Sequence, residues 1–94
     1  MLLSIFRVSG HSMEPTIIQG HFVMVSVIPY LFYNPQVGDI VVFQRNGKML
    51  IKRVEKKEDA KYFLVGDNRN DSLDSRKIGL VDRQNILGKV IAAI

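Results

Sequence analysis

The sequence predicts a mainly β fold, a sandwich or barrel built from several short strands. Two observations carry this prediction. Runs rich in β-branched and aromatic residues recur along the 94-residue chain, and strands prefer this composition. Between these runs lie Gly, Pro, Asn and Asp, the residues that mark turns. At this length the chain is expected to form one domain, residues 1–94, without a linker.

In the first half of the chain, three runs have the composition of strands. The last of them is strongly apolar and follows the turn that Gly38 and Asp39 predict. A loop rich in aromatic residues, residues 30–34, lies between Pro29 and Pro35 and is expected to be extended. The expected order is a strand over residues 5–8, a turn at 14–16, a strand over 22–28, the aromatic loop and a strand over 40–43.

The second half begins near Asn46-Gly47, the strongest hairpin signal in the sequence, because these residues adopt the positive φ angles of a two-residue turn. The strands on either side of it are therefore expected to pair. The remaining expected elements are a strand over 49–54, a polar connection over 56–61, a strand over 62–65, a polar loop over 66–76, one helical turn over 81–85 and a strand over 86–94.

Composition excludes several chemistries. There is no Cys, which excludes disulfides, thiolate metal sites and a cysteine nucleophile, and two His supply a zinc site poorly. We therefore expect neither a metal nor a cofactor. With 13 basic and 9 acidic residues the net charge is +4, which favours an anionic surface weakly and selects no partner.

Membrane signals in the sequence are weak. The run FVMVSVIPYLFY, residues 22–33, is shorter than the roughly 20 apolar residues of a spanning helix, and Pro29 interrupts it. The first residues, MLLSIFRV, lack the basic start of a signal peptide. We expect no transmembrane helix, although the run from Phe22 to Tyr33 could touch a membrane surface.

Ser12, in the segment GHSMEPTI, is a candidate nucleophile. A lone serine beside Gly is usually structural, so a nucleophilic serine needs a base nearby. His11 is its neighbour, but neighbours on an extended chain point to opposite faces. His21 lies at what is expected to be an exposed strand start, and no spacing supports a Ser-His-Asp triad.

Lys52 is the other candidate base. In the segment MLIKRV it follows Leu50 and Ile51. A strand lysine usually points to solvent. If Lys52 instead points inward, burial disfavours its charged form and lowers its pKa toward neutrality. A neutral amine can take the proton of a serine hydroxyl.

The polar loop over residues 66–76 has side chains that suggest two other kinds of site. A calcium loop starting at Asn68 fails, because Leu73 stands where Gly is required and Gly79 where the final Glu is required. Asp67 and Asp74 form a formal carboxylate pair for glycoside chemistry, but no other feature of the sequence supports a sugar site.

Four segments together resemble the ordered sequence boxes of the signal peptidase I family. The resemblance extends from about residue 8 to about residue 90. It implies a signal peptidase/LexA-like fold, in which coiled antiparallel β-sheets form a single small barrel-like domain. The segments are GHSMEPTI (10–17), GDIVVF (38–43), IKRV (51–54) and GDNRNDSLDSR (66–76).

The resemblance implies a catalytic dyad in a serine endopeptidase, with Ser12 as the nucleophile and Lys52 as the general base. Ser72 corresponds to a residue that orients the lysine through a hydrogen bond. Asp74 and Arg76 correspond to a charged pair that braces the site. The backbone N–H of Ser12 corresponds to an oxyanion donor.

The substrate backbone is expected to meet Gly10, Ser12 and Met13. Some family members have a serine at the position of Gly10 as a further oxyanion donor, and this chain lacks it. Family members bind an extended polypeptide by strand addition, so we expect shallow pockets near residues 6–13 and 49–52. The implied activity removes signal peptides or propeptides after small residues, in an Ala-x-Ala-like pattern, through an acyl-enzyme.

Three departures from the family leave the substrate open. Residues 1–94 do not include the N-terminal membrane anchor typical of the family. Residues 55–58 read EKKE in place of G-x-P-G-D, and residues 54–66 are too short for the family's second β domain. We expect a minimal catalytic core. It would be membrane-associated on the extracytoplasmic side as a signal peptidase, and cytoplasmic as an anchorless maturation protease.

Four alternatives stay open. A maturation protease would trim a metalloenzyme propeptide, as for nickel superoxide dismutase. A LexA-type peptidase would cleave itself, but the chain has no DNA-binding domain and its GDNR box points away from that type. An inactive β domain that binds peptides would be free to lose Ser12, Lys52 or Ser72. A nucleic-acid-binding barrel is disfavoured, and no nucleic acid is expected, because the aromatic run of residues 22–33 has no interleaved Arg or Lys.

Overall fold

The computed structural model describes residues 2–68 and 79–94. Within these residues the chain forms one antiparallel sheet of seven strands, in the order β1-β2-β7-β3-β4-β5-β6. The predicted mainly β, antiparallel fold is confirmed. The elements are β1 Leu3–Arg7, β2 Phe22–Ser26, α1 Pro29–Phe32, β3 Ile40–Arg45, β4 Lys48–Glu58, β5 Lys61–Val65, β6 Val81–Asp82, the 3-10 turn η1 Arg83–Asn85 and β7 Ile86–Ala93.

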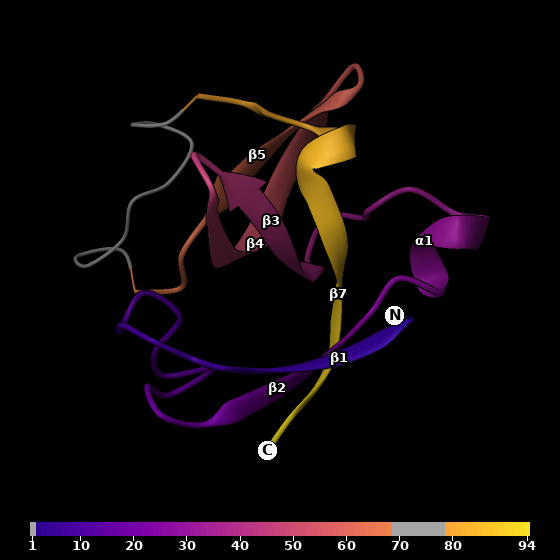
Figure 1. The fold of residues 1–94 in the computed structure, drawn as a ribbon. Coiled ribbons are helices and arrows are strands. Elements are labelled where there is room, and N and C mark those ends of the chain that lie inside the picture. The colour runs from indigo at the N-terminus through magenta and orange to yellow at the C-terminus, as the bar shows by residue number, and fades with distance from the viewer. Residues whose placement is uncertain (1, 69–78) are drawn as a thin grey trace.

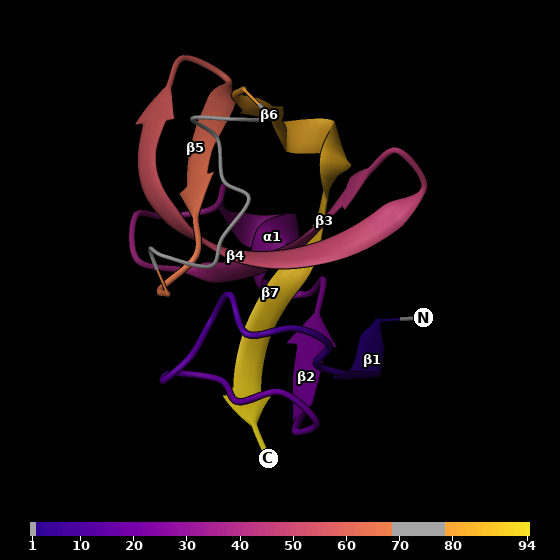
Figure 2. The ribbon, with the colours of Figure 1, turned by 90° about the vertical axis from the view of Figure 1, so that its left-hand side faces the viewer.

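The last strand, β7, connects the two parts of the sheet. It pairs with β2 on one side and with β3 on the other. Figures 1 and 2 show β7 running between β1 and β2 below and β3, β4 and β5 above. Gly88 permits this close packing, because a Cβ at this position would lie only 2.8 Å from Cγ1 of Val25.

The buried apolar side chains form two clusters, one on each face of β3. Val41 and Phe43 belong to the first cluster and Val42 to the second, because successive strand residues point to opposite faces. The second cluster includes residues of the turn that follows β1, which is thereby packed onto the sheet. The clusters are Tyr30, Val41, Phe43, Val54, Tyr62, Leu64, Val81 and Ile86, and Val8, Met13, Ile17, Val23, Val25 and Val42.

The hairpin predicted at Asn46-Gly47 is confirmed. Asn46 has a φ of 52° and Gly47 a φ of 78°, so both adopt the positive angles that a two-residue hairpin turn requires. Arg45 pairs with Lys48 directly across the turn. The pairing places β3 and β4 side by side, as the sequence predicts.

The prediction of an extended loop over residues 30–34 is wrong in part, because the single-turn helix α1 begins at Pro29. A proline suits the first turn of a helix, since its fixed φ is helical and its missing N–H has no partner there in any helix. Tyr30 turns inward and donates a hydrogen bond of 2.8 Å from its hydroxyl to Asp39 Oδ2. Burial in the first cluster raises the pKa of Tyr30.

The prediction of a polar connection over residues 56–61 is also wrong. β4 continues to Glu58 and pairs with β5, with Lys56 opposite Phe63 and Lys57 opposite Tyr62. The two lysine ammonium groups lie over these aromatic rings, 5.5 and 5.9 Å from the ring centroids. Long lysine stems cover apolar surface while their charges stay in water, so a polar segment forms a ribbon here.

Candidate active site

Ser12 lies in the turn of residues 10–20 that connects β1 to β2. The buried side chains of Met13 and Ile17 fix this turn in the second core cluster. Gly10 has a φ of +89°, a left-handed conformation that glycine adopts without strain. The positive φ angle of this position, two residues before the candidate nucleophile, therefore favours glycine over other residues.

Lys52 lies in β4, opposite Val41 of β3. Its side chain points inward and is 3% exposed. Within residues 2–68 and 79–94, no other charged residue is buried. Burial of an amine disfavours its charged form, because the ammonium ion loses hydration. The default orientation of a strand lysine toward solvent is therefore not the one observed.

Ser12 and Lys52 line the same groove, which has a volume of about 140 Å³. One wall consists of residues 6–9 with Ser12 and Met13, and the other of residues 49–52. These are the two segments near which the sequence predicts substrate pockets. Among the described strands, β1 pairs only with β2, and residues 48–52 of β4 pair only with β3. Each wall therefore carries a backbone edge that can accept an added strand.

Neither histidine lines this groove. The Nδ1 atom of His11 lies 2.7 Å from Oε2 of Glu14. This hydrogen bond lowers the pKa of Glu14, so the carboxylate stays charged and holds the imidazole. In the parts of the chain that the structure describes, no three His, Asp or Glu side chains lie close enough to share a metal ion.

Asp67 connects the turn of Ser12 to the strand of Lys52. Arg53, the residue after Lys52, donates from Nε and NH2 to the two carboxylate oxygens of Asp67, each at 2.8 Å. Thr16 donates from Oγ1 to Oδ2 of Asp67 at 2.5 Å. The Asp67 carboxylate raises the pKa of Arg53, so both partners of this ion pair are charged.

Asn68 adds two hydrogen bonds to the same turn. Its backbone N–H donates to the carbonyl of Ser12 at 2.8 Å, and its Nδ2 donates to the carbonyl of His11 at 3.1 Å. The sequence patterns assign no role to Thr16, Arg53 or Asn68, although all three lie inside the quoted boxes. Side-chain hydrogen bonds between segments this far apart cannot be read from spacing along the chain.

Three of the predicted site residues, Ser72, Asp74 and Arg76, lie outside the described residues. Their roles therefore stay predictions. The contacts of Asp67 argue against a role for Asp67 and Asp74 as a glycosidase carboxylate pair. Asp67 is bound by Arg53 and Thr16 and so serves in a structural network.

We expect Asp67→Asn to lower the free energy of unfolding by about 1 to 2 kcal/mol, because it weakens a bidentate, partly buried ion pair. The side chains of Arg53 and Asp67 are 33% and 16% exposed, so solvent screens part of the attraction. Thermal unfolding measures the effect, which corresponds to several degrees in a domain of this size.

The matched control for this prediction is Glu58→Gln, which removes one carboxylate charge from the exposed pair of Lys56 and Glu58. Exposed pairs contribute little, so this variant is expected to unfold within about 0.5 kcal/mol of the wild type. Equal unfolding temperatures for Asp67→Asn and Glu58→Gln would show that Asp67 does not hold the two segments together.

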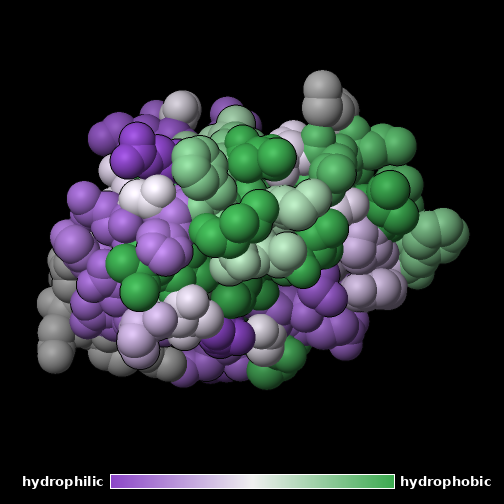
Figure 3. All heavy atoms as spheres, turned by 90° about the horizontal axis from the view of Figure 1, so that it is seen from below, coloured by the Kyte–Doolittle hydropathy of each residue, from purple (hydrophilic) through white to green (hydrophobic). Residues whose placement is uncertain are grey.

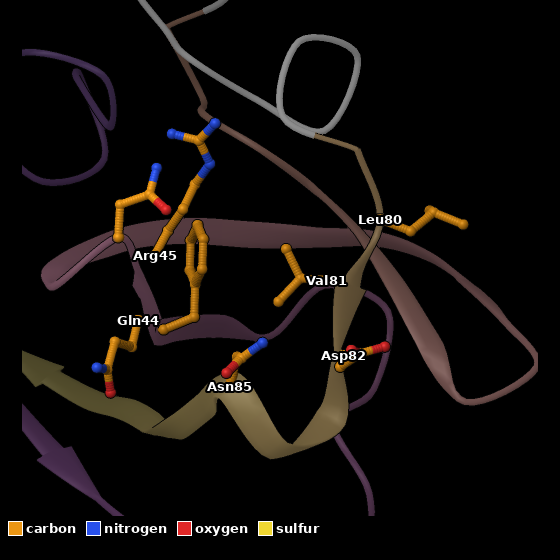
Figure 4. Close-up of a pocket in the computed structure, with 8 residues that line it drawn as sticks. Gln44, Arg45, Leu80, Val81, Asp82 and Asn85 are labelled. Carbon is orange, nitrogen blue, oxygen red and sulfur yellow. The ribbon is translucent and has the colours of Figure 1, made fainter.

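A larger hollow, of about 360 Å³, lies between the end of β3 and the segment of β6 and η1 (Figure 4). Gln44, Arg45, Asp82 and Asn85 give it a mainly polar lining. None of the predicted site residues that the structure describes lines it. The candidate site is thus identified by the meeting of a serine and a buried lysine, and size alone would point to the wrong hollow.

Comparison with known proteins places these residues in context. A family model described as Peptidase S24-like matches residues 3–91. The probable signal peptidase I-1 of Synechocystis sp. is 28% identical over an alignment of 131 residues, which covers 89% of this chain and 67% of the relative. Signal peptidase IB of Staphylococcus aureus is 27% identical over 141 residues, covering 90% of this chain and 74% of the relative.

A third relative, the chloroplastic thylakoidal processing peptidase 1 of Arabidopsis thaliana, is 25% identical over 130 residues. The alignment covers 85% of this chain but only 38% of that protein. All three alignments are longer than this chain of 94 residues, so the relatives carry insertions within the aligned region.

Proposed function

Because this chain belongs to the peptidase S24-like family and its relatives are signal peptidases, we propose that it is a serine endopeptidase with Ser12 as the nucleophile and Lys52 as the general base. The observation that carries this proposal is the groove that Ser12 shares with the buried Lys52. A serine hydroxyl is a weak nucleophile and needs a group that takes its proton. A buried amine is suited to this task, because burial favours the neutral form.

The proposed reaction is acyl transfer. Neutral Lys52 takes the proton of the Ser12 hydroxyl while the serine oxygen bonds to the scissile carbonyl carbon, and the carbonyl electron pair moves to its oxygen. The N–H of Ser12 donates to this oxyanion. The carbon–nitrogen bond then breaks, and the leaving amine takes the proton from Lys52. Water, deprotonated by Lys52, attacks the carbonyl carbon of the resulting ester. The carbon–oxygen bond to Ser12 breaks, the serine oxygen takes the proton back from Lys52, and the new carboxyl end is released.

The substrate in this proposal is an extended polypeptide, a signal peptide or a propeptide. It would add as a strand between residues 6–9 and residues 49–52, where two backbone edges face the groove. The backbone near Gly10 and Met13 would also meet this strand. Cleavage after an Ala-x-Ala-like pattern of small residues is the selectivity that the family resemblance implies for this groove.

Three further residues have roles in the proposal that come from the family resemblance. Ser72 would orient Lys52 through a hydrogen bond, and the pair of Asp74 and Arg76 would brace the site. As a signal peptidase the chain would act on the extracytoplasmic side of a membrane. As a maturation protease for a metalloenzyme propeptide it would act in the cytoplasm.

The proposal is tested with a peptide that carries Ala at the first and third positions before the cleavage point, incubated with the protein in detergent. We expect one cut after the second Ala, located by mass spectrometry. A matched peptide with Leu in place of that Ala should be cut at least about tenfold more slowly, since a larger side chain must fit the groove. Equal cleavage of the two peptides would contradict the proposed selectivity.

The protein's own mass should be recorded in the same incubation. A protein that shortens while both peptides stay intact would support the LexA-type alternative, in which the chain cleaves itself. Cleavage of the Ala peptide at an equal rate by the Ser12→Ala chain would disprove the proposed mechanism.

We also propose that part of residues 22–33 contacts a membrane surface. Within this run Val23 and Val25 are buried in the core, whereas Leu31 and Phe32 of α1 are 67% and 82% exposed. Figure 3 shows apolar side chains gathered over the face seen from below, where β1 and β2 lie, and continuing toward α1. No helix in the described ranges is long and apolar enough to cross a membrane.

We expect the wild type to co-sediment with vesicles that contain anionic lipid, because exposed apolar side chains and a net charge of +4 both favour such a surface. The double variant Leu31→Ser, Phe32→Ser should reduce the bound fraction several-fold. Asn34→Ser, at an exposed polar neighbour, should leave it unchanged. Equal binding of both variants would place the membrane contact elsewhere.

A further inference from the structure

We propose that Asn68 is a positioning residue that orients the backbone N–H of Ser12 toward the oxyanion. This inference rests on the proposed function and deepens it, because it names the group that sets the direction of the oxyanion donor. No residue outside the turn was assigned this task by the sequence. The proposal follows from two hydrogen bonds and from the planarity of the peptide unit.

Asn68 holds two successive peptide units of the Ser12 turn. Its Nδ2 donates to the carbonyl of His11 at 3.1 Å, and its backbone N–H donates to the carbonyl of Ser12 at 2.8 Å. The N–H of Glu14 donates to the same His11 carbonyl at 3.1 Å, from within the turn. Among the described residues, the His11 carbonyl thus receives two donors, one local and one from a segment 57 residues away.

The carbonyl of His11 and the N–H of Ser12 belong to one peptide unit. A trans peptide unit is planar, and its C=O and N–H point in opposite directions. The bond from Asn68 Nδ2 therefore fixes the direction of the Ser12 N–H as well. By the same geometry, the bond from the Asn68 backbone to the Ser12 carbonyl fixes the direction of the Met13 N–H.

The Ser12 N–H is available for this role. It donates to no backbone carbonyl within residues 2–68 and 79–94. An oxyanion donor contributes most when it is already aimed at the position where charge develops, because no reorganisation is then needed during the reaction. The hydrogen bond from Asn68 to the His11 carbonyl, at the opposite side of the same peptide unit, fixes the direction of the Ser12 N–H without touching the substrate.

The position of Asn68 in the chain also connects the Ser12 peptide unit to the strand that carries Lys52. Asn68 follows Asp67, whose carboxylate is bound by Arg53 of the Lys52 strand. Residues 67 and 68 therefore connect the peptide unit of the nucleophile to β4, the strand of the general base. The proposal assigns the orienting contact to the side chain of Asn68 and the connection to β4 to Asp67.

The test uses Asn68→Ala and Asn68→Asp. Both keep the backbone bond to the Ser12 carbonyl. Asn68→Ala removes the side-chain donor, and Asn68→Asp replaces it with a charged acceptor that the His11 carbonyl oxygen repels. We expect kcat to fall about tenfold, less than the 10²- to 10³-fold that follows loss of an oxyanion donor itself, and KM to change less than twofold. Gln84→Ala and Gln84→Glu make comparable changes at an exposed amide of η1 and should leave both constants unchanged.

A purely structural role predicts a different pattern. A peptide aldehyde forms a reversible tetrahedral adduct with the Ser12 oxygen and so reports on the oxyanion donors. Its affinity should fall by the same factor as kcat. Affinity for the intact substrate, measured in the Ser12→Ala background with and without Asn68→Ala, should change less than twofold. Equal losses for aldehyde and substrate would overturn the orienting role.

A readout that does not depend on activity completes the test. The carbonyl ¹³C signal of His11 should shift upfield in Asn68→Ala, because the carbonyl loses one of its two donors, and it should not shift in Gln84→Ala. An unchanged signal overturns the proposal whatever the activity. If the signal shifts but the wild type cleaves no peptide, the hydrogen bond from Asn68 to His11 is supported and the proposed peptidase activity is contradicted. Failure of this inference and failure of the proposed function can therefore be told apart.

Discussion

The Ser12→Ala chain is expected to cleave the Ala-x-Ala peptide at least about 10⁴-fold more slowly than the wild type. The chain has no Cys, and Ser9 is the only other hydroxyl-bearing residue of the described part of the chain that lines the groove, so Ser9→Ala should keep its activity. The measurement is the initial rate of product formation, followed at saturating peptide.

Binding should survive this change. Ser12 is partly exposed and its side chain is small, so its removal leaves the walls of the groove and the backbone edges intact. The expected result is a peptide affinity within about twofold of the wild type. Ser4→Ala, in β1 and outside the groove lining, is the matched control and should keep full activity. A Ser12→Ala protein that cleaves within tenfold of the wild type would assign the nucleophile to another residue.

Lys52→Met is expected to abolish cleavage to a similar degree while preserving the fold. Methionine has a similar length and no amine, so the Ser12 hydroxyl loses the group that takes its proton. We expect a loss of activity of at least about 10³-fold, with a circular dichroism spectrum that shows the same strand content as the wild type.

The variant Lys52→Arg distinguishes a lysine that acts as a base from a lysine that contributes only a positive charge. A guanidinium group stays protonated in proteins, so this variant keeps a cation at the site but cannot act as a base. We expect it to be inactive. If Lys52→Arg retained substantial activity, Lys52 would act through its charge and the proposed base would be wrong.

The dependence of the wild-type rate on pH follows from the same group. Only the neutral amine can take the serine proton, so the rate should be low in acid, rise with pH as the ammonium ion loses its proton, and then level off. The pH at which the rate rises reports the protonation of the amine that takes the serine proton. A rate that falls as pH rises from acid to neutral would contradict a lysine base.

Local sequence signals were sufficient for most of the sheet. The hairpin at Asn46-Gly47 was predictable because positive φ angles demand these residues in the turn itself. The strands on either side were predictable because their residue types prefer a pleated, half-buried surface. The short helix at Pro29 and the ribbon of Lys56 and Lys57 were not, because each depends on packing against residues far along the chain.

The candidate site divides in the same way. The segments GHSMEPTI and IKRV could be singled out by their residue types, and the resemblance to signal peptidase I supplied expected roles for Ser12 and Lys52. The contacts from Thr16 and Arg53 to Asp67, and from Asn68 to His11, could not be predicted. Hydrogen bonds of this kind depend on the register of whole strands and leave no spacing pattern.

By itself the sequence determined the fold class, the principal turns and which residues are candidates for the chemistry, because these depend on local backbone preferences and on side-chain type. Only the tertiary structure decided that Lys52 faces inward and that it shares a groove with Ser12. Strand alternation permits a lysine on either face, and the pairing of β4 with β3 and the insertion of β7 between β2 and β3 select one. The meeting of these two side chains is a consequence of that sheet order.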